Sequence, residues 1–170
     1  MTNSEMTKIF ALLMMNYQNA ETFKGGIAKL KPTIQWWTTC LADVDFRVAQ
    51  LAVQRLCQTC EYPPTIADFR KQVLRIEQEM KSEMESLWLE IRSWDKSIGI
   101  EAGYSKLPAN SKLRRIIDHM GGPKALIFHG KKPNGEPFSL LNILGFEEAY
   151  MAVALCHSLP QNERKQLTIG

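Results

Sequence analysis

Two cysteines, Cys57 and Cys60, have the C-x-x-C spacing that is found in metal sites and redox centres. A structural zinc site needs four ligands, which usually come as two such pairs, and the other cysteines are Cys40 and Cys156. The pair also lies near the C-terminal end of a predicted helix, whereas a reactive thiol needs a helix N-terminus to lower its pKa. We therefore expect buried, unreactive thiols and no bound metal.

A second candidate for chemistry is the Gly-Lys pair at Gly130 and Lys131, which is similar to the end of a phosphate-binding loop. The pattern G-x-x-x-x-G-K-[ST] requires a glycine at position 125 and a serine or threonine at position 132. The chain has Ala125 and Lys132 instead. The sequence therefore predicts no ATP-binding loop and no ATPase activity.

The three histidines, His119, His129 and His157, have no carboxylate or nucleophile at a useful spacing. A catalytic acid or base needs such a partner within hydrogen-bond reach. The acidic residues of the segment 75–85 alternate with basic ones, which is typical of a solvent-exposed helix face with i,i+4 ion pairs. We assign no catalytic residue and no cofactor, and we expect that the protein is not an enzyme.

Basic residues are concentrated in the segment 106–132, which has seven lysines and arginines but one acid, Asp118, although the net charge of the chain is only +3. Two interpretations stay open: a solvated surface, or a contact with nucleic acid or an acidic protein face. No aromatic series alternates with these charges, which argues against a groove for single-stranded nucleic acid. The candidate partner-binding residues of this segment are Lys112, Arg114, Arg115, Lys124, Lys131 and Lys132.

Trp36 directly precedes Trp37 in a predicted helix. Because two consecutive helical residues cannot both face the same core, we expect one of the two indoles to be exposed. An exposed tryptophan is a frequent anchor of a protein interface. Trp36 is therefore a further candidate partner-binding residue, and packing against the long helix described below is the alternative.

The elements that position these residues are predicted to be helices. A capping pattern at Thr2 and Glu5 begins the first helix, whose apolar residues predict burial around most of its circumference. Pro32 favours the first turn of a second helix. Asp43 or Asp45 caps a third helix, which carries the C-x-x-C pair.

The chain is then broken by Pro63–Pro64, and Thr65 and Asp68 form a second capping pattern. The helix that follows, 65–98, has an apolar residue at every third or fourth position. It is about 50 Å long, which is more than one small core can cover, so we expect a cluster of helices near each end. The stripe consists of Ile66, Phe69, Val73, Ile76, Met80, Met84, Leu87, Ile91, Trp94 and Ile98.

The rest of the chain predicts shorter helices. One covers 107–120 and is ended by Gly121–Gly122, and the last covers 146–159. The segment 131–137 is typical of a turn, and 125–129 is the one place where a short strand fits the composition.

The predicted fold is all-α. It consists of an N-terminal helical domain at 1–68, a long connecting helix at 65–98, a smaller C-terminal helical domain at 99–160 and a mobile tail at 161–170. No apolar run is long enough to span a membrane, and no basic segment precedes the first apolar run as it does in a signal peptide. We therefore expect a cytoplasmic protein with reduced thiols.

The first seventy residues, about 40% of the chain, resemble the bacteriophage family that loads and inhibits the replicative DNA helicase. The most specific part is the block Y-P-P-T-I-A-D-F-R, from Tyr62 to Arg70. The other residues that carry the resemblance are Trp37, Leu41, Asp43, Ala49 and Ala52.

This resemblance implies a small helical protein without an ATPase of its own. It implies binding to the hexameric replicative helicase in the bacterial host cell, with the helicase held inactive until contact with an origin-bound initiator releases it. In that family the N-terminal helical domain is the ordered part and the C-terminal part engages the helicase. The C-terminal seventy residues of this chain are instead predicted to fold.

Our leading hypothesis from the sequence is thus a phage replication protein that binds the hexameric helicase and loads or inhibits it. The first alternative is a nucleic-acid-binding replication accessory protein, which would use the basic segment for a weak DNA contact. The second is a phage inhibitor of another host enzyme. The expected partners are the helicase and an origin-binding initiator, with no membrane contact.

Overall fold

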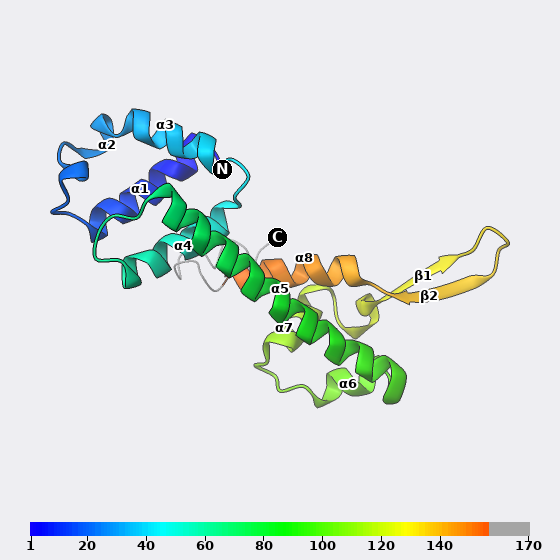
Figure 1. Ribbon diagram of the computed structural model, residues 1–170. Coiled ribbons are helices and arrows are strands. Elements are labelled where there is room, and N and C mark those ends of the chain that lie inside the picture. The colour runs from blue at the N-terminus through cyan, green and yellow to red at the C-terminus, as the bar shows by residue number, and fades with distance from the viewer. Residues whose placement is uncertain (157–170) are drawn as a thin grey trace. The chain divides into compact units, whose positions relative to one another are not determined.

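The computed structural model describes residues 1–156 of the chain (Figure 1). The fold divides into two units, Met1–Glu79 and Met80–Gly170. The long helix α5, Ile66–Ser97, contributes residues to both units. The predicted tail at 161–170 and the last three residues of the predicted final helix lie outside the described residues.

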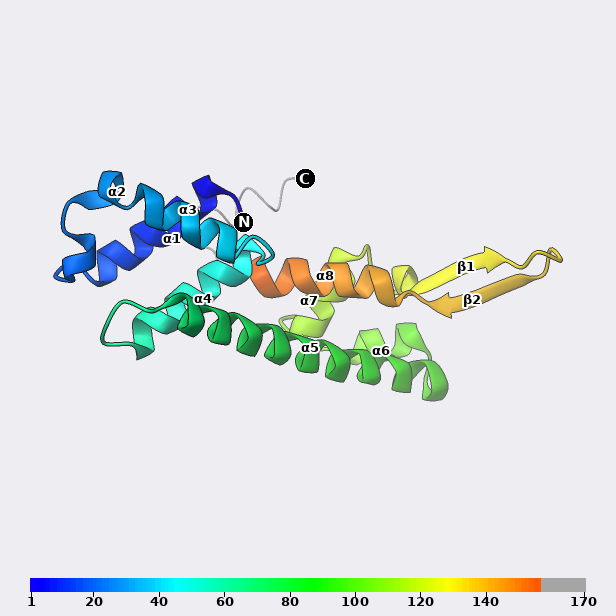
Figure 2. The same cartoon turned by 45° about the horizontal axis from the view of Figure 1, so that its top comes forward.

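The first unit, unit 1, consists of short helices around the beginning of α5, and α1 contacts both α3 and α4 (Figures 1 and 2). Its helices besides α5 are α1 (Asn3–Asn16), η1 (Glu21–Phe23), α2 (Gly26–Lys29), α3 (Lys31–Cys40) and α4 (Phe46–Thr59).

Side-chain caps fix where α1, α4 and α5 begin, as the sequence predicts. Thr2 and Glu5 form a capping box at α1, and Asp45 accepts hydrogen bonds from two backbone amides at the start of α4. At α5, the Thr65 hydroxyl accepts from the Asp68 amide at 3.2 Å, and the Asp68 carboxylate accepts from the Thr65 amide at 3.0 Å. Such caps satisfy amides that have no partner within the helix.

The core of unit 1 contains an aromatic series that joins three helices. The ring of Trp37 on α3 packs edge-on against Phe10 of α1 at 5.2 Å and against Phe69 of α5 at 5.7 Å between centroids. All three side chains are buried. The prediction that α1 is buried around most of its circumference is wrong, since Leu12 is 37% exposed and Met15 is 71% exposed.

The apolar stripe of α5 serves a different core in each unit. Phe69, Val73 and Ile76 are buried in unit 1, and Ile91 and Trp94 are buried in unit 2. The methionines and the leucine between them are partly buried against the core of unit 2. Ile98, the last predicted member, follows the end of the helix and is exposed.

The second unit, unit 2, surrounds the remainder of α5 with three helices, a 3-10 turn and two strands. Its core is formed by Ile91, Trp94, Ile100, Leu113, Ile116, Ile117, Leu126, Phe146, Ala149 and Tyr150. Its elements after α5 are α6 (Ile100–Lys106), α7 (Lys112–His119), η2 (Pro123–Leu126), β1 (Ile127–Lys131), β2 (Pro137–Leu141) and α8 (Ile143–Cys156).

The predicted helix at 107–120 is shorter in the structure and has a neighbour that the sequence did not predict. α7 begins after Ser111, whose side chain accepts a hydrogen bond from a backbone amide, and Gly121 and Gly122 end it at φ of 100° and 97°, as expected. This neighbour, α6, contains Gly103. Because glycine has no side chain, the helix can pack closely against the buried Trp94 ring at this position.

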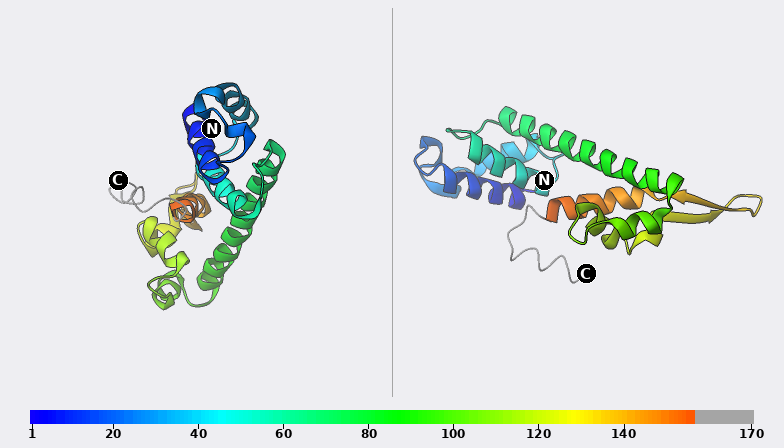
Figure 3. Two further views of the ribbon diagram at one scale, coloured as in Figure 1. Left: turned by 90° about the vertical axis from the view of Figure 1, so that its left-hand side faces the viewer. Right: turned by 90° about the horizontal axis from the view of Figure 1, so that it is seen from below.

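The main departure from the all-α prediction is an antiparallel hairpin, in which Ile127–Lys131 pairs with Pro137–Leu141. The structure is mainly helical but includes these two strands. The predicted turn at 131–137 connects them, and only β1 overlaps the segment where a strand was expected. The hairpin extends away from the helices of unit 2 (Figures 1 and 3). No helix in the described part of the chain has the length and apolar character to cross a membrane.

Candidate partner-binding surfaces

Lys112, the first basic residue of the predicted patch, is half-buried in contacts within unit 2. Its ammonium lies 2.6 Å from the Glu83 carboxylate and 4.8 Å from the centre of the Tyr150 ring. The Tyr150 hydroxyl donates to the same carboxylate at 2.6 Å. The three side chains therefore tie α5, α7 and α8 together.

This cluster changes the acidity of two of its members. Burial raises the pKa of Glu83, but the hydrogen bonds from Lys112 and Tyr150 outweigh it, so the pKa of that carboxyl lies below its ordinary value. Burial and the hydrogen bond to Glu83 raise the pKa of Tyr150. The tyrosine thus stays a neutral donor beside an ionised acceptor.

Arg114 also makes its contacts within unit 2. Its guanidinium lies 4.7 Å from the centre of the Tyr104 ring and donates to the carbonyl of Leu107 at 3.0 Å. The Tyr104 hydroxyl donates to Asp118 at 2.6 Å. Arg115, its neighbour on α7, is half-buried. Arg114 therefore has a structural role in joining α6 to α7.

The other basic residues lie on different elements. Lys124 is exposed on η2, Lys131 is exposed at the end of β1, and Lys132 forms a 3.1 Å ion pair with Glu136 in the hairpin loop. Lys131 ends β1 and Lys132 begins the turn that leads to β2. The structure thus does not gather the six predicted residues into one surface.

One tryptophan of the pair on α3 is buried and the other is exposed, as the sequence predicts. Trp37 is 8% exposed and belongs to the aromatic series, whereas Trp36 is 62% exposed. The alternative, in which Trp36 packs against the long helix, is therefore wrong. Trp36 stays a candidate contact residue.

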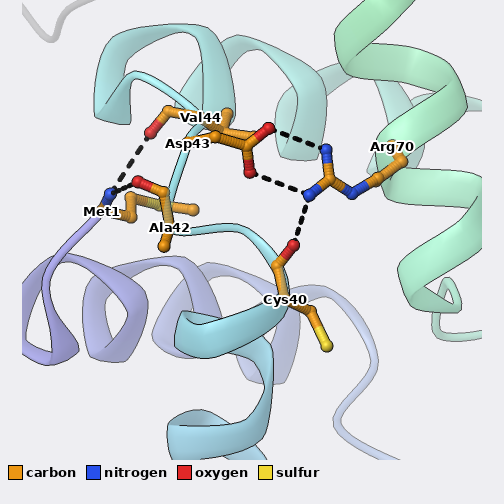
Figure 4. A network of polar contacts seen from close by, with 6 residues as sticks. All are labelled: Met1, Cys40, Ala42, Asp43, Val44 and Arg70. Carbon is orange, nitrogen blue, oxygen red and sulfur yellow. Dashed lines mark hydrogen bonds and ion pairs between the residues drawn. The ribbon is translucent and has the colours of Figure 1, made fainter.

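The block from Tyr62 to Arg70 has a structural role at its C-terminal end (Figure 4). The Arg70 guanidinium on α5 donates to both carboxylate oxygens of Asp43, at 3.0 and 2.8 Å, and to the carbonyl of Cys40. The hydrogen bond from Arg70 lowers the pKa of Asp43. Beside this pair, the Met1 amino group donates to the carbonyls of Ala42 and Val44.

Two residues that carry the sequence resemblance, Asp43 and Arg70, thus fasten the α3–α4 connection to α5. Phe69 fills the core, and Thr65 and Asp68 cap the helix. These positions specify the fold of unit 1. Its partner-binding surface has to be sought among other residues.

A candidate surface, which the sequence did not predict, lies between α1 and α4. A hollow of about 360 Å³ is lined by Leu12, Met15, Asn16, Val53, Gln54, Cys57 and Gln58. We call it the α1–α4 groove. A second hollow of about 500 Å³ adjoins it at Met15 and is bordered by Tyr62, which is 73% exposed. The surplus of apolar residues on α1 was the signal in the sequence, because one helix face cannot bury all of them.

Cys57, the first cysteine of the C-x-x-C pair, lines this groove. Cys57 and Cys60 are half-buried free thiols, so they are more accessible than predicted. Burial and the neighbouring Cys60 raise the pKa of the Cys57 thiol, which makes it a poor nucleophile. Among the side chains that the structure describes, no group of three or more His, Cys, Asp or Glu could hold a metal ion.

Unit 1 is therefore a small helical domain whose surface, rather than an enclosed polar site, is available to other molecules. Residues 1–70 match the family model of the N-terminal domain of gp39P-like proteins. This match confirms the resemblance of the N-terminal part of the chain to the phage helicase loader and inhibitor family. No curated protein and no solved structure matches the chain.

Proposed function

We propose that this protein binds the hexameric replicative DNA helicase in a phage-infected cell and loads or inhibits it without an ATPase of its own. The observation that carries the proposal is the match of residues 1–70 to the gp39P N-terminal domain family. Those residues make up most of unit 1. The protein acts by stoichiometric binding, and a sixfold ring offers several equivalent sites that would raise the overall avidity.

We assign the contact made by unit 1 to the α1–α4 groove. The exposed apolar side chains of the groove are Leu12 and Met15, and the exposed Tyr62 borders the adjoining hollow. Methionine is flexible and polarisable and adapts to an apolar partner surface. The polar residues of the groove are uncharged amides, so an apolar segment of the helicase can be buried there without stranding a charge.

The proposal that the protein lacks an ATPase is supported by the conformation around Gly130 and Lys131. A phosphate-binding loop follows a strand and leads into a helix, whose first amides hold the phosphates. Here both residues lie within strand β1 of the hairpin, and the chain continues into a turn and β2. The energy for loading would then come from the helicase or from a further partner.

The proposal is tested by measuring the ATPase rate and DNA loading of the cognate helicase as the full chain is added. We expect either rate to change until each helicase subunit or pair of subunits has one copy bound. ATP hydrolysis by the protein alone should stay at the background level. Helicase rates that do not change at saturating concentrations would contradict the proposal.

A further inference from the structure

The hairpin of unit 2 has two unpaired edges, and they are not equivalent. Asn142 donates to the Leu126 carbonyl, and Lys132 donates to the Glu136 carbonyl, both at 2.8 Å. Hydrogen-bonded pairs alternate along an antiparallel ladder, so the pairs between these ends are Phe128 with Leu140 and Gly130 with Phe138. The residues between these hydrogen-bonded pairs direct their amides and carbonyls away from the partner strand, toward the free edge of the sheet.

On β1 the outward residues are Ile127, His129 and Lys131. The Ile127 amide donates to the Lys124 carbonyl, whereas His129 and Lys131 have outward amides to donate. On β2 they are Leu141, Ser139 and Pro137, and proline has no amide hydrogen. Next to the hairpin turn, the β1 edge therefore offers two successive donors, at His129 and Lys131, whereas Pro137 interrupts the β2 edge there. Within the described residues the sheet has only these two strands.

The two faces of the hairpin differ in character. Phe128 and Leu140 are 55% and 61% exposed on one face, where the Phe138 ring covers Gly130. The opposite face carries His129 and Lys131, both exposed. A hairpin of two strands is only marginally stable by itself, so these exposed apolar groups favour a partner.

Charge identifies the chemistry of that partner. β1 carries Lys131 and His129 and no acid, and Lys131 makes no ion pair within the residues that the structure describes. Glu136, the acid of the loop, is engaged by Lys132. A second copy of this chain would bring the same basic residues to the edge. Nucleic acid would need several free cations, whereas the two strands carry one lysine, Lys131, and no arginine.

We propose that the β1 edge of the hairpin binds an extended segment of another protein in which acidic and apolar residues alternate, added as a third strand. Its acids would face Lys131 and His129, and its apolar residues would cover Phe128 and Gly130. This binding mode uses main-chain hydrogen bonds for affinity and alternate side chains for specificity. It does not depend on the helicase, so either proposal can fail alone.

The test is an NMR titration of the ¹⁵N-labelled full chain with a synthetic peptide of alternating glutamate and valine. We expect the amide signals of His129 and Lys131 to shift. A peptide of alternating lysine and valine should bind at least about tenfold more weakly, because it repels Lys131.

Two matched variants test which edge is used. His129→Pro removes an outward amide of β1, and Ser139→Pro removes its counterpart on β2. Each leaves the internal ladder intact, and each loses the 2.8 Å contact between the two side chains. His129→Pro should weaken binding of the glutamate peptide at least about tenfold, and Ser139→Pro should leave it unchanged.

Four results would overturn the proposal. The first is that the β1 amide signals do not shift with the glutamate peptide. The second is that the two peptides bind equally, and the third is that the two proline variants bind the glutamate peptide equally. In the fourth, the same signals shift on raising the protein concentration or on adding duplex DNA, which would assign the edge to a second copy or to nucleic acid.

Discussion

The two units attach α5 to their other helices with polar contacts of different kinds. In unit 1, α5 forms ion pairs at the surface, Arg70 with Asp43 and Glu79 with Arg55. In unit 2, α5 supplies an anion, Glu83, which accepts a hydrogen bond from the buried Tyr150. Because an exposed ion pair contributes little net free energy, unit 1 must rely on its aromatic core. Unit 2 should depend more on its polar cluster.

The largest expected effect is that of Trp37→Ala. It removes the middle ring of the aromatic series and leaves a cavity, which should destabilise unit 1 by about 3–5 kcal/mol. Hydrogen exchange followed by mass spectrometry measures this for each segment. Protection should fall in α1, α3 and α4 and persist in α7 and α8.

The matched control is Trp36→Ala, which removes an exposed indole from the preceding position. Its effect on stability should be within about 0.5 kcal/mol. Equal losses from the two substitutions would contradict the assignment of Trp37 to the core.

Gly103→Ala should have the next largest effect, and it acts in unit 2. A Cβ atom there would lie 2.2 Å from the ring of Trp94, which is buried in the core. The gain in helix propensity is about 0.5–1 kcal/mol, while overpacking costs about 1–3 kcal/mol, so we expect a net loss. The urea midpoint of the full chain measures it, and a stabilised variant would show that α6 can move away.

Tyr150→Phe tests the polar cluster of unit 2. It removes the hydroxyl that donates to Glu83 and leaves the ion pair with Lys112. We expect a loss of about 1 kcal/mol, at the low end for a charged acceptor because Glu83 is partly in contact with water. Hydrogen exchange should become faster in α8 and stay unchanged in α1. Unchanged protection in α8 would mean that the apolar core alone holds the helix.

The smallest effect is expected for Asp43→Asn, which breaks the surface pair with Arg70. The pKa of Asp43 is lowered from its ordinary value of 3.8, so the pair stabilises the fold above that pH. This contribution is lost as the pH falls through the pKa of the folded state. The urea midpoints of variant and wild type should therefore differ slightly at pH 7 and converge in acid. A difference that persists in acid would assign the effect to packing.

The sequence predicted unit 1 more closely than unit 2. The caps at Thr2, Asp45 and Thr65 are local signals, and the structure places a helix start at each. The α5 stripe was also readable because its period is that of a helix. The exposure of Met15 could not be predicted from the spacing of apolar residues, because that spacing does not show how far a neighbouring helix extends along α1.

Two features of unit 2 depend on contacts between distant residues. β2 pairs with β1 through a turn, and its segment 137–141 has no alternation of apolar and polar residues that would identify a strand. The basic residues of 106–132 are close in sequence, yet Lys112 pairs with Glu83 and Lys131 is the last residue of β1. Charge density along a sequence does not specify a surface.

The most direct test of the proposed function is the binding of the full chain to the cognate replicative helicase, measured by sedimentation velocity with wild type and Met15→Glu. Met15 is highly exposed, so the variant should keep the fold and its hydrogen-exchange protection. We predict saturable binding of wild type to the ring, weakened at least about tenfold by the buried charge. No binding of wild type would contradict the proposed function, and equal binding of the two proteins would contradict the assignment to the α1–α4 groove.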